Sequence, residues 1–327
     1  MTIRRMNELQ SAILFDDAEM LDVDAFIMRN IEAFRSVAGP LAGPQERVAS
    51  GVMMGSGHDG LFVTIEFLPH QADAAVFAPT LQSPFTQISY PEGAARLGRH
   101  RSHALVTVRH GIMPDMPEVR GFVDNLELAQ PGNTFEDFDL RVRLLATISE
   151  RLVAERNAST VHWTPSNTLL YANSFSADQL ARHPSPLMVH PRLFGAPVVE
   201  GFAEVPAGFF SLGASNYLGR EIHVTAAPVP WSEQFQAALA FIAVTLDRGA
   251  PYPDGDTFSD PDQTVLYRVN HVDSGDDMLP EPHFRLTLER SETHGYVAGG
   301  RTAASKATTV PTSDGKVVRG LFGRFRR

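Results

Sequence analysis

Four histidines form the group of side chains best suited by type to bind a metal ion or transfer a proton. His100, His103 and His110 lie close together in the sequence, and His162 precedes Trp163. A metal site needs three or more nitrogen or oxygen ligands that converge. His103 and His110 are an odd number of residues apart on one expected strand, so they point to opposite faces. The sequence therefore predicts no metal site, and these imidazoles are expected to be partly buried polar groups.

A second pattern, G-x-G-x-x-G, is formed by Gly55, Gly57 and Gly60. In dinucleotide-binding proteins such glycines let a phosphate approach the amino terminus of a following helix. Here the following residues, LFVTIEF, are typical of a strand. The pattern therefore predicts a glycine-rich hairpin turn and no bound cofactor.

The segment PDGDTFSDPD holds four aspartates: Asp254, Asp256, Asp260 and Asp262. An EF-hand loop has glycine at its sixth position and glutamate at its twelfth. Counted from Asp254, those positions are Ser259 and Val265. The segment is expected to be a hydrated turn between a helix and a strand.

Serine chemistry could involve two groups, Ser166 with His162 and Asp178, and Ser215 in the segment GASNY. Neither serine lies in G-x-S-x-G, and the chain contains no P-loop, no H-E-x-x-H and no kinase signature. No catalytic residue is assigned from the sequence.

The elements that must position these side chains are clearest between Ala207 and Val269, where a strand pair, a helix and a strand are expected. Ser232 is expected to cap the helix, and Gly249 with Pro251 to end it. The helix carries an apolar stripe at helical spacing, namely Phe235, Leu239, Ile242 and Leu246. The strand before it places Ile222 and Val224 on one face, and Glu221, His223 and Thr225 on a face expected to be wet.

The segment FGAPVVEGFAEVPAGFFSLGASNYLGREIHV, the helix after it and PDGDTFSDPDQTVLYRV resemble the bacterial domain-of-unknown-function 4261 family. SHALVTVRHG and the long helix before STVHWTPSNTLLYANSF are also similar to the amino-terminal part of such proteins. The resemblance covers most of residues 100 to 270. It implies a fold, and it implies no catalytic residues because none is established for the family.

In the first half, a strand at 11–15 is followed by a helix that Asp22 or Asp24 caps. A hairpin, a short helix from Pro91 and the strand SHALVTV come next, and residues 68–87 are expected to be irregular. Strand, helix, strand, strand, helix, strand is the ferredoxin-like, or split βαβ, order.

The predicted fold class is α+β, with two α+β halves built on mixed or antiparallel sheets. The predicted divisions are an amino-terminal half at 1–110, a connector at 111–133, a carboxy-terminal half at 134–290 with the family-like unit at about 193–269, and a disordered tail at 291–327.

Composition favours a cytoplasmic location. The 327 residues are 43% hydrophobic and 20% charged, with no cysteine, so disulfides, thiolate metal sites and cysteine nucleophiles are excluded. No apolar run is long enough to span a membrane, and the segment MTIRRMNELQ has no apolar signal region.

The net charge of −10 is unevenly distributed. The tail from residue 316 holds five cations and no acid, so residues 1–315 carry −10 − 5 = −15. The acidic body disfavours nucleic acid and anionic lipid, which the tail alone could attract. The tail cations are Lys316, Arg319, Arg324, Arg326 and Arg327.

The function that these features favour is a non-catalytic cytoplasmic binding or accessory protein, whose acidic body or basic tail contacts a protein partner. Two alternatives stay open. One is an enzyme that uses a cleft between the halves with some of His103, His162 and Glu66. The other is a peripheral membrane or nucleic-acid contact through the tail.

Overall fold

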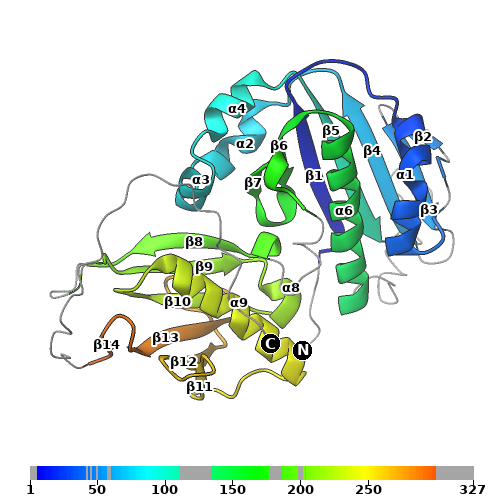
Figure 1. Cartoon of the computed structure of the whole chain (residues 1–327). Coiled ribbons are helices and arrows are strands. Elements are labelled where there is room, and N and C mark those ends of the chain that lie inside the picture. The colour runs from blue at the N-terminus through cyan, green and yellow to red at the C-terminus, as the bar shows by residue number, and fades with distance from the viewer. Residues whose placement is uncertain are drawn as a thin grey trace.

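A computed structural model of the protein describes residues 6–41, 43–44, 46–48, 51–56, 60–110, 134–176, 186–197, 202 and 204–299. Two sheets with helices packed against them make up this part of the chain (Figure 1). The predicted α+β class, with mixed and antiparallel sheets, is confirmed.

The first sheet has the strand order β2-β3-β4-β5-β1-β6-β7, and every neighbouring pair is antiparallel. Its strands are β1 (Glu8–Phe15), β2 (Glu46–Val48), β3 (Gly51–Ser56), β4 (Leu61–Leu68), β5 (Ser102–His110), β6 (Ala158–Trp163) and β7 (Thr168–Tyr171). The interior strand β1 is buried on both faces from Ser11 onward, which explains its continuous apolar run AILF.

Two long helices, α1 (Val23–Ala38) and α6 (Phe135–Glu155), pack on each other and on one face of this sheet (Figure 1). The Asp22 side chain accepts a hydrogen bond from the Ala25 N–H, which confirms one of the two predicted caps. A capping box formed by Thr134 and Asp137 starts α6. These local signals fix where both helices begin.

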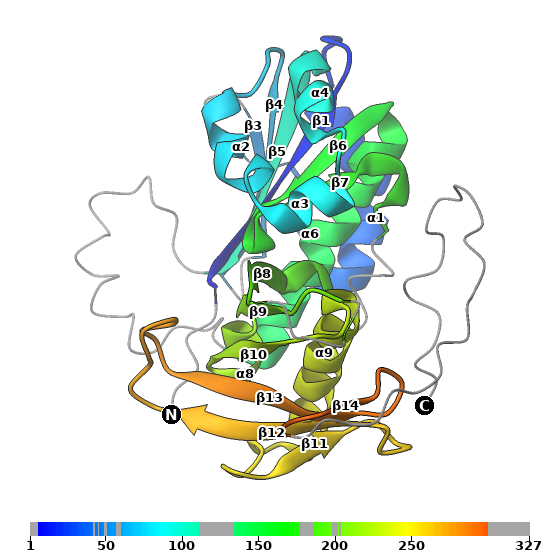
Figure 2. The same ribbon diagram turned by 90° about the vertical axis from the view of Figure 1, so that its left-hand side faces the viewer.

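The second sheet has the order β11-β12-β13-β10-β9-β8, and β14 pairs with β13. Its strands are β8 (His190–Gly195), β9 (Ala207–Leu212), β10 (Glu221–Ala227), β11 (Thr257–Ser259), β12 (Val265–Val272), β13 (His283–Ser291) and β14 (Tyr296–Val297). The pairing of β10 with β13 is parallel, and the other pairings are antiparallel. Two strands that are far apart in the sequence therefore lie side by side (Figure 2).

Helix α9 (Trp231–Arg248) covers one face of the second sheet, next to the short helix α8 (Ser215–Leu218). Phe241 of α9 lies against Phe284 of β13, with ring centroids 5.6 Å apart. The helix starts two residues earlier than a cap at Ser232 predicts, so Ser232 lies inside the first turn and Pro230 occupies the cap position without a side-chain hydrogen bond. Its end is as predicted, because Gly249 adopts a left-handed φ of 65°.

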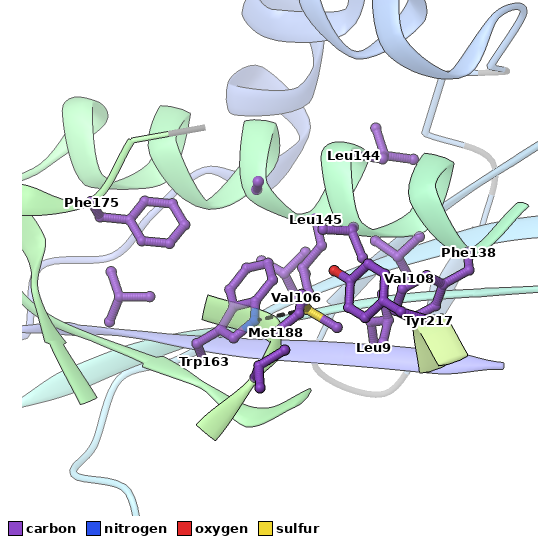
Figure 3. Close-up of a cluster of buried hydrophobic side chains, with 14 of the residues drawn as sticks. Leu9, Val106, Val108, Phe138, Leu144, Leu145, Trp163, Phe175, Met188 and Tyr217 are labelled. Atoms are coloured by element: carbon purple, nitrogen blue, oxygen red, sulfur yellow. Dashed lines mark hydrogen bonds between the residues drawn. The ribbon is translucent and has the colours of Figure 1, made fainter. Parts of the chain in front are cut away.

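The two sheets share one apolar core (Figure 3). Tyr217 of α8 packs edge-on against Phe138 of α6, with ring centroids 5.7 Å apart. The indole N–H of Trp163 points at the sulfur of Met188, 3.3 Å away. The second half is therefore packed directly against the first sheet and its long helix.

The split βαβ order predicted for the first half is wrong. That arrangement would place β1 between β4 and β5, whereas β1 lies between β5 and β6, and β4 is antiparallel to β5. A strand of eight residues spans about 26 Å, which a helix of about 17 residues can recross. The helices between β4 and β5 have eight, six and seven residues, and each is too short to recross the sheet. The connection therefore enters β5 at the same end of the sheet at which β4 finishes.

Those three helices are α2 (Ala74–Leu81), α3 (Pro84–Ser89) and α4 (Gly93–Arg99), and they lie on the face of the first sheet opposite α6 (Figure 2). The sequence does not predict the first two, because prolines usually interrupt helices. Pro84 instead is the first residue of α3, where an N–H would have no partner within the helix and its absence costs nothing. Burial of Phe77 and Tyr90 in a second apolar cluster stabilises these short turns against their weak intrinsic preference.

The predicted connector at 111–133 lies outside the described residues. The chain after it, α6 with β6 and β7, joins the sheet of the first half, so the two sheets divide the chain after residue 171. Part of the tail expected from 291 is regular, since β14 pairs with the end of β13, and residues 300–327 lie outside the described part. The basic residues from 316 lie outside the described part. Among the described residues, no helix is long and apolar enough to cross a membrane.

Candidate metal centre

The histidines near position 100 each bind a neighbouring group. His100 donates to the Leu97 carbonyl (2.5 Å) and accepts from the Ala72 N–H (2.9 Å). His103 donates to the His70 carbonyl (2.9 Å) on one face of β5. His110 accepts from Arg141 of α6 (2.5 Å) on the other face, as the odd spacing predicts.

The candidate serines for nucleophilic chemistry are not joined to the expected partners. His162 bonds to Asn167 (3.1 Å), while Ser166 bonds to Thr168 (3.0 Å). Ser215 donates to the Glu221 carboxylate, 2.6 Å away. Asp178 lies outside the described residues.

Aspartates of the PDGDTFSDPD segment hold their own turn together. Asp254 accepts from the His271 N–H (2.7 Å), Asp256 from the Thr257 N–H (2.8 Å) and Asp260 from the Val265 N–H (2.8 Å). Upstream, β3 and β4 form a hairpin with Ser56 opposite Leu61, so the G-x-G-x-x-G pattern lies at a hairpin, as predicted.

Glu66, His103 and His162, named for the enzyme alternative, share one face of the first sheet. The pairing register puts Glu66 and His162 in the same row on β4 and β6, with β5 and β1 between them. At roughly 4.8 Å per strand, their Cα atoms are about 14 Å apart. This face alone does not bring the three side chains together.

The structure instead brings together three residues of the second sheet that no sequence pattern marks as a group. His223, Asp276 and His283 each offer one ligand atom, and these atoms lie within 4.8 Å of one another. His283 Nε2 is 3.5 Å and His223 Nδ1 is 4.0 Å from the same oxygen, Oδ2 of Asp276. We call these three residues the His-Asp-His cluster.

Parallel pairing of β10 with β13 positions the two histidines. Glu221 lies opposite His283, and His223 opposite Arg285. His223 and His283 are therefore diagonal neighbours on one face, while Ile222 and Phe284 point to the face that α9 covers.

The expectation that Glu221 and His223 face water is wrong, because both are buried, with exposed fractions of 8% and 7%. Glu221 accepts hydrogen bonds from Ser211 (2.6 Å) and from the backbone N–H of Gly213 (3.0 Å). The His223 ring lies against the ring of Phe210, with centroids 4.5 Å apart. Neighbouring side chains thus cover a face that strand alternation alone marks as polar.

The acidic loop 273–282 carries Asp276 onto this face. Arg220, just before β10, forms an ion pair with Asp273 (2.6 Å) and fastens the start of the loop. Asp276 Oδ1 accepts from the backbone N–H of Met278 (2.9 Å) and Leu279 (2.7 Å), which directs Oδ2 toward the histidines.

Gly275 has a special role in this loop. Its φ is 71°, and a Cβ atom there would lie 2.1 Å from the Pro280 carbonyl oxygen. Closure of the loop over the sheet therefore requires glycine at this position.

Both imidazoles present a nitrogen that has no hydrogen-bond partner. His283 is fully buried and His223 is nearly so. Water therefore does not reach His223 Nδ1 or His283 Nε2, and neither atom has a hydrogen-bond partner. A buried polar atom without a partner costs about 1–3 kcal/mol. The Nδ1–H of His283 donates to the Glu281 carbonyl (2.9 Å), so its Nε2 carries the free lone pair.

The charges of the cluster suit a cation. The Leu279 N–H and the bonds from Arg285 and Met278 lower the pKa of Asp276 to about 2, so its carboxylate is ionised. Burial, together with His283 and Arg285, lowers the pKa of His223 to about 4 against the opposing effect of Asp276. At neutral pH, one carboxylate and a neutral imidazole are thus in the states that metal binding requires.

The distances also fit a transition-metal ion. Bonds of roughly 2.0–2.2 Å in a tetrahedron separate ligand atoms by about 3.4 Å, so small side-chain rotations would close the cluster around an ion. Two imidazoles and one carboxylate suit zinc and similar ions better than magnesium or calcium, which prefer oxygen ligands. Three protein ligands leave a fourth position open.

No family model matches the chain, and no curated protein or solved structure matches it. The resemblance to the domain-of-unknown-function 4261 family therefore stays a prediction, and the cluster is assigned from its own geometry.

Proposed function

We propose that this protein is a cytoplasmic binding protein whose folded body binds a divalent transition-metal ion through His223 Nδ1, His283 Nε2 and an Asp276 carboxylate oxygen. The supporting observation is that two buried, unpartnered imidazole nitrogens converge on one ionised carboxylate oxygen. Although Arg285 already pairs with this oxygen, the two imidazole nitrogens cost free energy until they gain a partner, which a bound metal ion would supply.

The proposal keeps the expected class of a binding protein but departs from the expectation that no metal is bound, because the cluster joins residues that no sequence pattern groups together. Contact of a partner through the acidic surface or through the basic tail, and the cytoplasmic location, stay part of the proposal.

Zinc titration of the tag-free, full-length protein after treatment with a chelator tests this function, because a histidine tag would itself bind the metal. We expect one equivalent to bind. His223→Gln, His283→Gln and Asp276→Asn should each weaken binding by more than the ~10–100-fold typical for loss of a supporting partner.

His162→Gln is the matched control, since His162 is equally buried but bonds to Asn167. It should bind zinc as the wild type does. Absence of stoichiometric binding by the wild type, or an equal loss in His162→Gln, would contradict the proposed function.

A further inference from the structure

Arg285 contacts the carboxylate oxygen of the His-Asp-His cluster. Its Nη2 donates to Asp276 Oδ2, the same oxygen that both histidines approach. His223 Nδ1 and His283 Nε2 are buried against the sheet, whereas the side chains of Asp276 and Arg285 are 23% and 35% exposed. A ligand of the ion therefore enters from the side of Arg285.

A divalent ion and the Arg285 guanidinium repel each other at this distance, so metal binding displaces the guanidinium from Asp276. The partly exposed side chain has water into which it can turn. Once released, it remains anchored on β13 beside the ion and is available to a ligand that the ion also binds.

The pairing register shows a second cation in the same row of the sheet. Arg192, Phe210, His223 and Arg285 lie opposite one another on β8, β9, β10 and β13. Arg192 is exposed and has no ion-pair partner among the described residues. Arginines thus flank His223, one strand away on one side and two strands away on the other.

From this row we infer, on the basis of the proposed metal function, that the protein binds a small phosphate-bearing dianion at the open position of the ion. A divalent ion held by one carboxylate carries a net charge of +1, and the guanidinium groups of Arg285 and Arg192 lie in the same row of the sheet. Guanidinium groups match the oxygen geometry of phosphate.

The same face supplies an apolar surface for the remainder of such a ligand. Phe194 and Phe210 lie side by side, with ring centroids 5.0 Å apart, and Phe210 packs on His223. Gly208 makes this possible, because a Cβ there would lie 2.7 Å from the Phe194 ring. A ligand with an aromatic body next to its phosphate fits this surface better than inorganic phosphate alone.

The experiment loads the full-length protein with cobalt(II), whose visible absorption reports the ion and its ligands, and then adds inorganic phosphate, phenyl phosphate or acetate. We expect the spectrum to change saturably with phosphate, more tightly with phenyl phosphate, and at least about tenfold more weakly with acetate. Arg285→Gln should keep cobalt binding but lower phosphate affinity about tenfold, and Arg192→Gln should lower it less.

Arg268→Gln is the matched control, because Arg268 lies on the same face but is held by Glu289 (2.8 Å). It should leave phosphate affinity unchanged. Failure of cobalt to bind would overturn the proposed function itself. Cobalt binding without a phosphate response, an equal response to acetate, or full phosphate affinity in Arg285→Gln would overturn the dianion site alone.

Discussion

Histidines of the two sheets differ in what their ring nitrogens bind. In the first sheet and its surroundings, each buried histidine bonds to a neighbouring residue, namely His100, His103, His110 and His162. His190, the first residue of β8 in the second sheet, is also partnered, because it lies between Ser83 and Thr168. In the second sheet, His223 and His283 each keep one buried nitrogen unpartnered. The histidines of the first sheet stand out by their closeness in the sequence, whereas His223 and His283 stand out by a buried ring nitrogen without a hydrogen-bond partner.

The largest expected effect is the acid sensitivity that a buried, partnered histidine gives to the folded protein. Burial, aided by nearby Arg192, lowers the pKa of His190 from 6.5 to about 4. The unfolded chain therefore takes up a proton before the folded one, and stability falls as the pH drops from about 6.5 to about 4. The full effect is about 3 kcal/mol.

Urea unfolding of the wild type and His190→Gln at pH 7.5 and pH 4.5 measures this contribution. The variant should lose less stability on acidification than the wild type, by up to the same ~3 kcal/mol. An identical change in unfolding free energy between the two pH values in both proteins would show that burial of His190 does not contribute to acid sensitivity.

Zinc should stabilise the folded protein through His223 and His283 by a similar amount. A ligand that binds the folded state alone adds about 2.7 kcal/mol at 100 times its dissociation constant. We expect the melting temperature of the wild type and of His162→Gln to rise with zinc. His283→Gln should show no rise, and a rise equal to that of the wild type would place the ion elsewhere.

The smallest expected effect comes from a change in the loop that leaves all three ligand residues in place. Gly275→Ala should weaken zinc binding about tenfold, or 1.4 kcal/mol, because the added Cβ meets the Pro280 carbonyl and shifts Asp276. Gly255→Ala is the control, since Gly255 has a similar φ of 77° and a Cβ added there would have no neighbour within 4 Å. Equal zinc affinity in the two variants would show that the loop adapts without moving Asp276.

Local patterns are sufficient to predict the long helices. Asp22, the Thr134 capping box and Gly249 act within one turn of the chain, so their signals can be read from neighbouring residues. The partners of β1 cannot be read in this way, because pairing of β1 with β5 and β6 joins residues that are far apart in the sequence.

The His-Asp-His cluster escapes prediction for the same physical reason. Strand alternation correctly separates His223 from Ile222, but it carries no information about what covers each face. The burial of His223 depends on Phe210 and on a loop that arrives some fifty residues later, and its diagonal contact with His283 depends on a parallel pairing. An acidic loop that ends at a histidine opening a strand is the one local signal that points to His283.

The interior position of β1, between β5 and β6, also has a consequence for synthesis of the chain. This strand leaves the ribosome early, but its two neighbours, β5 and β6, are made much later. At about 5–20 residues per second, the wait for β6 is on the order of ten seconds. Both edges of this apolar strand are free until β5 has been made, and the edge that pairs with β6 stays free until residue 163 has emerged. The nascent chain should therefore depend on chaperones that bind extended apolar segments.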